Sequence, residues 1–110
     1  MRYGIVADIH ANLAAFEAVL ADMGQVDTVW CLGDLVGYGP DPNECIELLR
    51  RQNHRCVVGN HDLAAIGRLD TSDFNAAAAE AAEWTARNLT DRSRLYLEEL
   101  PEKLVVESFT

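Results

Sequence analysis

The sequence YGIVADIH at residues 3–10 contains a short apolar run that ends at an aspartate and a histidine. An apolar run of this length, rich in β-formers and without a polar break, is typical of a strand buried on both faces. The pattern recurs as TVWCLGD at 28–34 and as RCVVGNHD at 55–62. We therefore predict three short strands, each followed by a polar loop.

Amphipathic segments separate these runs. Asn12 is a suitable N-cap for a helix with apolar residues at helical spacing, which Gly24 would end. Asp41 and Pro42 are typical of a second helix start, and the apolar stripe continues to about Gln52. Strands that alternate with helices indicate right-handed crossovers. The sequence thus predicts an α/β fold with a central, mostly parallel β-sheet flanked by helices.

The second half of the sequence is mainly helical. Ser72 is a suitable cap for an alanine-rich helix that reaches about Asn88, and Thr90 is one for a shorter helix. The segment LVVESF at 104–109 is typical of a fourth strand. Because that strand would need neighbours, we expect residues 1–110 to be the N-terminal part of a single larger domain, incomplete at its C-terminus.

The composition excludes several classes of protein. Hydrophobic residues make up 49% of the chain, which excludes intrinsic disorder, and no apolar run approaches the ~20 residues of a membrane span. Asp8 and His10 interrupt the N-terminal apolar stretch, which argues against a secretory signal. A formal net charge of −9 disfavours binding to duplex nucleic acid. The cysteines lack the spacing of a disulfide framework or a zinc site, so we expect a cytoplasmic protein with reduced thiols.

The side chains that could bind a metal ion or take part in catalysis lie in the three loops after the strands. Asp8 and His10 follow the first strand, Asp34 follows the second, and Asn60 and His61 follow the third. The carboxyl ends of parallel strands meet at one edge of a sheet, so these loops should converge. Singly, each residue could be a turn or cap residue. Together, carboxylates, an imidazole and an amide oxygen indicate a divalent-metal site that suits Mn, Fe, Zn or Co better than Ca or Mg.

The three loop motifs have a family resemblance. DIH at 8–10, GDLVGYG at 33–39 and GNHD at 59–62 resemble the motifs of the calcineurin-like metallophosphoesterase superfamily, in the right order and with a helix between each pair. The resemblance is close over residues 1–66, and the GYGPDP loop is similar to that of small bacterial and archaeal phosphodiesterase-type members. It implies a metallophosphoesterase α/β sandwich, of which residues 1–110 would be the N-terminal part.

The resemblance also implies roles for individual residues. Asp8 and His10 resemble ligands of a first metal ion, and Asp34 resembles a carboxylate that bridges to a second. Asn60 resembles a ligand of the second ion, and Asp62 has only a supporting role. His61 resembles the catalytic histidine, which contacts the substrate phosphate without binding metal. The implied cofactor is two divalent metal ions, Mn²⁺ before Fe, Zn, Ni or Co, with a bridging hydroxide that attacks a phosphomonoester or phosphodiester.

The sequence departs from the family pattern in two places. Gly37 and Tyr38 occupy the positions where protein phosphatases and symmetrical dinucleoside tetraphosphatases carry a phosphate-binding arginine. The later histidine motifs are absent, since only His10, His54 and His61 occur, and His54 lies at the wrong end of its strand. Besides a metallophosphoesterase, a dinucleoside polyphosphate hydrolase and a noncatalytic scaffold for protein interaction stay open as alternatives. The expected partner is a small phosphate ester, with no membrane partner, and an oligomer is compatible with the sequence.

Three other residues have less specific interpretations. Trp30 and Trp84 are expected to be core aromatics. For Tyr38, packing within its loop is favoured over contact with a substrate.

Overall fold

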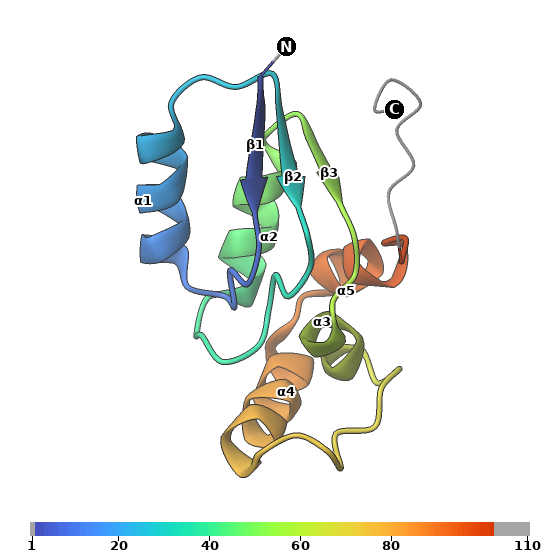
Figure 1. The fold of residues 1–110 in the computed structure, drawn as a ribbon. Helices are drawn as coiled ribbons and strands as arrows, with labels where there is room; N and C mark the ends of the chain where they lie inside the picture. Colours follow the sequence, from blue (N-terminus) through green and yellow to red (C-terminus); the bar gives the residue numbers. More distant parts are fainter. Residues whose placement is uncertain (1, 103–110) are drawn as a thin grey trace.

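A computed structural model describes residues 2–102 of the chain. Its sheet contains β1 (Tyr3–Val6), β2 (Thr28–Cys31) and β3 (His54–Cys56). All pairings are parallel, and the strand order is β1-β2-β3 (Figure 1). The prediction of an α/β fold with a parallel central sheet is confirmed. The predicted strand at 104–109 lies outside the described residues.

Two helices connect the strands, α1 (Leu13–Met23) and α2 (Pro42–Arg50). The caps predicted for α1 are confirmed, since the Asn12 side chain accepts a hydrogen bond from the Ala15 N–H and Gly24 ends the helix at φ 70°. Right-handed crossovers between strands in sequential order place both helices on the same face of the sheet. In Figure 1, α1 lies beside β1 and α2 lies behind the strands.

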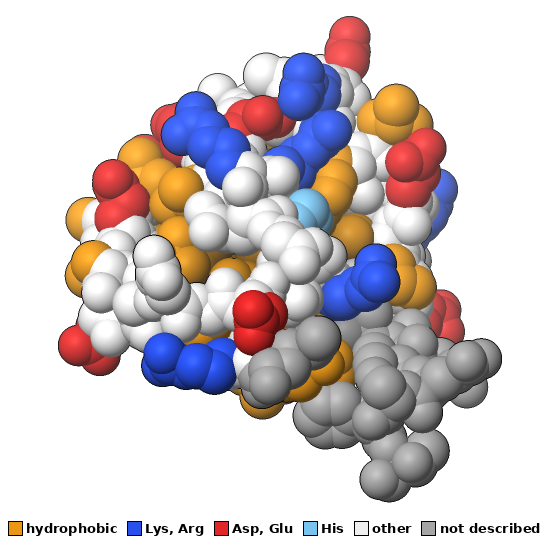
Figure 2. Space-filling view, turned by 90° about the horizontal axis from the view of Figure 1, so that it is seen from above, with side chains coloured by type: hydrophobic (Ala, Val, Ile, Leu, Met, Phe, Trp, Pro, Cys, Tyr) orange, Lys and Arg blue, Asp and Glu red, His pale blue; other side chains and the backbone are white. Residues whose placement is uncertain are grey.

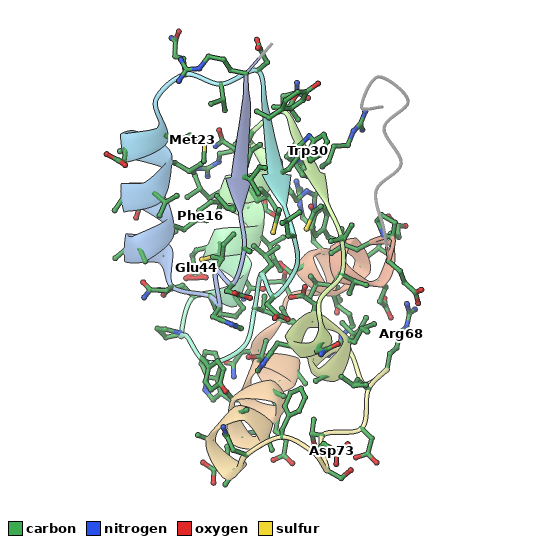
Figure 3. All side chains as sticks on the ribbon, viewed as in Figure 1. Phe16, Met23, Trp30, Glu44, Arg68 and Asp73 are labelled. Carbon is green, nitrogen blue, oxygen red and sulfur yellow. The ribbon has the colours of Figure 1, made fainter. Side chains whose placement is uncertain are left out.

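The core lies between these two helices and the sheet. Phe16 and Met23 point from α1 toward the sheet (Figure 3), and Phe16 is almost completely buried. The strand residues on this side are buried as well, whereas Ile5 and Leu32 on the other side are 61% and 51% exposed. The prediction that the strands are buried on both faces is therefore wrong for the described residues. This face of the sheet is exposed because both crossover helices cover the opposite face.

Within the described part of the chain, three further helices follow β3. They are α3 (Asn60–Ala65), α4 (Ala76–Asn88) and α5 (Asp91–Glu98). The expectation of a polar turn at 59–62 is wrong, because α3 begins within that segment. The Gly59 N–H donates to the Asp62 carboxylate, which satisfies a backbone donor at the start of the helix.

The alanine-rich helix starts later than its sequence indicates. Asn75 rather than Ser72 caps α4, since the Asn75 side chain accepts from the Ala78 N–H at 2.8 Å. Trp84 is 38% exposed on this helix, so its prediction as a core aromatic is wrong. The buried face of α4 carries Ala78, Ala82 and Thr85, and a helical turn of 3.6 residues places position 84 off that stripe. No helix among residues 2–102 is both long and apolar enough to cross a membrane.

Truncation of one core leucine tests this packing. Leu49 on α2 is 0% exposed, so Leu49→Ala should lower the free energy of unfolding by about 2–5 kcal/mol. Leu95 on α5 is 55% exposed, and Leu95→Ala should cost less than about 1 kcal/mol. Urea denaturation of both variants measures the difference. Equal losses would contradict the placement of the core.

Candidate metal centre

The loops after β1 and β2 continue the pairing of the strands beyond their ends. The Asp8 N–H donates to the Gly33 carbonyl at 3.2 Å, and the His10 N–H donates to the Asp34 carbonyl at 3.0 Å. The backbone alone therefore holds the two loops side by side. The side chains of Asp8, His10 and Asp34 are not needed for this pairing and remain available for other contacts.

These three side chains converge. Asp8, His10 and Asp34 each offer one ligand atom, and the three atoms lie within 4.8 Å of one another. The Oδ1 atom of Asp8 is 3.9 Å from Nε2 of His10, and the Asp8 side chain is 70% exposed. Within residues 2–102, this is the one group of three or more acidic, cysteine or histidine side chains close enough to share an ion. The expected convergence is confirmed, and metal binding by the group stays a prediction.

The imidazole of His10 is oriented by a contact behind it. Its Nδ1 lies 3.3 Å from the Val36 carbonyl oxygen. A carbonyl only accepts hydrogen bonds, so Nδ1 is the donor in this contact and Nε2 is the ring nitrogen left for a ligand. Histidine ligands of metal ions are held in this way by a second hydrogen bond, which fixes the tautomer and the ring orientation. The donor set of the group thus fits a metal ion.

Backbone strain is concentrated in the same two loops. Every non-glycine residue with positive φ in the described part of the chain lies there: Asp8, His10, Ala11, Asp34 and Tyr38, with φ between 49° and 63°. The left-handed conformation costs roughly 1–2 kcal/mol for a residue with a Cβ. Such strain tends to cluster at ligand sites, where the surrounding structure enforces it.

The third loop reaches the group through Asp34. The Oδ1 atom of Asp34 accepts a hydrogen bond from the His61 N–H at 2.9 Å. The backbone of Gly59 lies so close to the Asp34 carboxylate that a Cβ there would overlap with it, so this position requires glycine. Asn60 is the exposed first residue of α3 and stands between these two neighbours of Asp34. The role of Asn60 as a metal ligand stays a prediction.

Asp62 joins the second loop to the third. Its side chain is fully buried, and Oδ1 accepts from the Val36 N–H at 3.0 Å while Oδ2 accepts from the Gly59 N–H at 2.9 Å. Burial raises the pKa of Asp62 to about 6, although the two N–H donors act in the opposite direction. Asp62 is buried in this junction and holds the second and third loops together.

The ring of His61 lies among other rings beside the group. Its centroid is 4.9 Å from that of His10, 5.0 Å from that of Tyr38 and 4.8 Å from that of Phe74. A Cβ at Gly37 would lie 2.9 Å from His61 Nδ1, so the ring also packs closely against that backbone. Phe74 was missed by the sequence analysis. The sequence feature that could have indicated Phe74 is a single aromatic residue in a polar segment directly before the cap of α4.

Among residues 2–102, the opposite end of the sheet carries no comparable group. His54 opens β3 there and its Nε2 lies 2.9 Å from the Tyr96 hydroxyl, so the expectation that it stands outside the site is confirmed. A hollow of about 600 Å³ at this end is lined partly by Arg2, Asp27 and Asn53. Figure 2 shows basic and acidic side chains interspersed over this end. The candidate metal ligands thus lie at the carboxyl edge of the sheet.

Residues 1–105 match the family model of the calcineurin-like phosphoesterases. The match spans nearly all of the sequence, and the protein belongs to this family. An uncharacterised protein of Methanocaldococcus jannaschii is 42% identical over 105 residues, which cover 94% of this chain and 42% of that protein. A symmetrical bis(5'-nucleosyl)-tetraphosphatase of Pectobacterium atrosepticum is 39% identical over 64 residues, which cover 54% of this chain and 23% of that enzyme.

A solved structure agrees with the fold. The crystal structure of a metallophosphoesterase from Sphaerobacter thermophilus superposes with a TM-score of 0.81 at 50% sequence identity. The superposition covers 96% of this chain and 44% of that one. The chain thus spans less than half the length of these relatives.

The two hydrogen bonds accepted by Asp62 predict how its substitution changes the free energy of unfolding. In Asp62→Asn one carboxylate oxygen becomes an amide nitrogen, which cannot accept from a backbone N–H. We expect the free energy of unfolding to fall by about 1–3 kcal/mol in chemical denaturation. Asp22→Asn, on the exposed side of α1, is the matched control and should change it by less than about 0.5 kcal/mol. Equal stability of the two variants would show that the junction at Asp62 does not hold the loops.

Proposed function

We propose that the protein is a metal-dependent phosphoesterase that hydrolyses a phosphomonoester or phosphodiester. The observation that supports this most directly is the convergence of Asp8, His10 and Asp34 at the carboxyl edge of the sheet. Family membership supports the same class of reaction. The contact of His10 Nδ1 with the Val36 carbonyl, which leaves Nε2 beside the Asp8 carboxylate, favours an enzyme over a noncatalytic scaffold.

Two metal ions complete the proposal. Asp8, His10 and Asp34 would hold the first, and Asp34 together with Asn60 would serve the second. Carboxylate, imidazole and amide ligands suit Mn²⁺, with Fe, Zn, Ni or Co as alternatives. When bound, such ions stabilise charge on phosphoryl oxygens and activate water. They also supply positive charge locally, so that a protein of net charge −9 can receive an anionic substrate.

His61 is the proposed catalytic residue of this chain. Its ring lies beside His10 and close to Gly37, which restricts its motion. In this place it would contact the substrate phosphate and donate a proton to the leaving oxygen. Asp34 contributes to its position, because the Asp34 carboxylate accepts the His61 backbone N–H.

A second candidate is hydrolysis of a dinucleoside polyphosphate. The 39% identity over 64 residues to an enzyme named for that reaction favours it. Gly37 and Tyr38 stand where the resemblance leads us to expect an arginine for phosphate binding, and this ranks the candidate second.

Replacement of the shared carboxylate tests the metal site. Asp34→Asn keeps an oxygen that can accept the His61 N–H, so the fold should be retained while the ligand charge is lost. Substitution of a residue that hydrogen-bonds to a metal ligand typically lowers metal affinity by about 10–100-fold. Because Asp34 is itself a proposed ligand, we expect Asp34→Asn to lower metal affinity by at least about 100-fold. Elemental analysis after purification without chelator should find at least one ion fewer per chain than in Asp22→Asn. Wild-type metal content and phosphoesterase activity in Asp34→Asn would refute the proposal.

Removal of the imidazole tests the proton donor. His61→Ala should keep its metal content and lower kcat by about 10²–10⁴-fold. The loss should be smaller for p-nitrophenyl phosphate than for an alkyl phosphate, because a p-nitrophenolate leaves without a proton. His54→Gln, at the far end of the sheet, should keep the wild-type kcat. A His61→Ala loss that is the same for both leaving groups would contradict the role as a proton donor.

A further inference from the structure

A groove with aromatic walls includes Tyr38, whose ring contacts that of His61. It has a volume of about 180 Å³ and is lined by Tyr38, Gly39, Pro40, Ala81 and Trp84; we call it the aromatic groove. One wall belongs to the loop between β2 and α2, and the other belongs to α4. Small residues between the two aromatic side chains leave the space open.

The two aromatic residues gain little from the protein core. The side chains of Tyr38 and Trp84 are 51% and 38% exposed. Tyr38 also has a φ of 63°, which is strained for a bulky residue. Exposed aromatic surface and backbone strain both cost free energy, and the contacts of Tyr38 with the rings of His10 and His61 offset these costs only in part. A ligand that covers the rings would account for both.

The groove has a fixed position relative to the candidate metal centre. The Gly39 N–H donates to the His10 carbonyl at 2.8 Å, and the Asp41 N–H donates to the Ala11 carbonyl at 2.9 Å. These bonds attach the Tyr38 loop to the loop of a candidate ligand. The Tyr38 ring centroid is 5.2 Å from that of His10 and 5.0 Å from that of His61. A group in the groove would therefore be next to a phosphate held at the metal centre.

We propose that the aromatic groove binds a planar aromatic ring, of a nucleobase or an aryl group, that is esterified to the substrate phosphate. This inference rests on the proposed function and names its substrate class. The groove is smaller than the roughly 300–1,000 Å³ of sites that enclose a whole drug-sized ligand, so it suits a single ring system. None of its lining residues is charged, so it would select flat, weakly polar groups by stacking.

Fluorescence of Trp84 measures this binding directly. The sequence has two tryptophans, so Trp30→Phe leaves Trp84 as the single reporter. In this background we expect AMP to quench the emission and to bind at least about fivefold more tightly than ribose 5-phosphate, which lacks the base. Tyr38→Gly removes the ring and suits the positive φ, and it should bring the two affinities to within about twofold. Phenyl phosphate shows which kind of ring the groove prefers. If it binds as tightly as AMP, the groove accepts any aryl ring; if it binds more weakly, the groove prefers a nucleobase.

The outcomes separate this inference from the proposed function. Equal binding of AMP and ribose 5-phosphate, or no response of Trp84 to AMP, would overturn the inference whatever the activity. With active protein, Tyr38→Gly should lower the ratio of kcat/KM for aryl over alkyl esters at least about fivefold, whereas Trp30→Phe should keep the wild-type ratio. An unchanged ratio in Tyr38→Gly would also overturn the inference. Failure of the proposed function would appear instead as absence of hydrolysis for every ester.

Discussion

The buried carboxylate of Asp62 is the interaction on which the candidate metal centre depends. One oxygen accepts the Val36 N–H and the other accepts the Gly59 N–H, so the loops after β2 and β3 are joined through one side chain. A buried carboxylate without donors is costly. The two loops therefore cannot separate without leaving this group unsatisfied. The distance between the Asp34 carboxylate and the His61 backbone depends on the same junction.

The rest of the site is held by the backbone. Hydrogen bonds between the loops of Asp8 and Asp34 extend the β1–β2 pairing past the strand ends, and the Val36 carbonyl orients the imidazole of His10. Gly59 and Gly37 permit approaches that a Cβ would block. Ligand positions that are fixed by a sheet and by backbone contacts need little reorganisation when an ion binds. The acidic side chains and the strained backbone lie in the loops at the carboxyl edge of the sheet. The hydrophobic core lies elsewhere, on the face of the sheet that α1 and α2 cover.

Local signals in the sequence predicted much of this arrangement. The Asn12 cap, the Gly24 stop and the alternation of strands with helices depend on neighbouring residues, and all were confirmed. The start of α3 was missed because a distant backbone donor, the Val36 N–H, helps to hold the Asp62 carboxylate at the first turn of that helix. The exposure of Trp84 was missed because it depends on which face of α4 packs against the domain. The convergence of the polar loops was predictable, since parallel strands bring their carboxyl ends to one edge.

We propose that the carboxyl edge of the sheet holds a metal ion between Asp8, His10 and Asp34. Crystals soaked in MnCl₂ and measured near the manganese absorption edge test it most directly, because anomalous scattering locates the ion without assumptions about activity. We expect a peak within coordination distance of both carboxylates and of His10 Nε2, with Nδ1 still bonded to the Val36 carbonyl. A fully ordered site without a peak, or coordination of manganese through Nδ1, would contradict it.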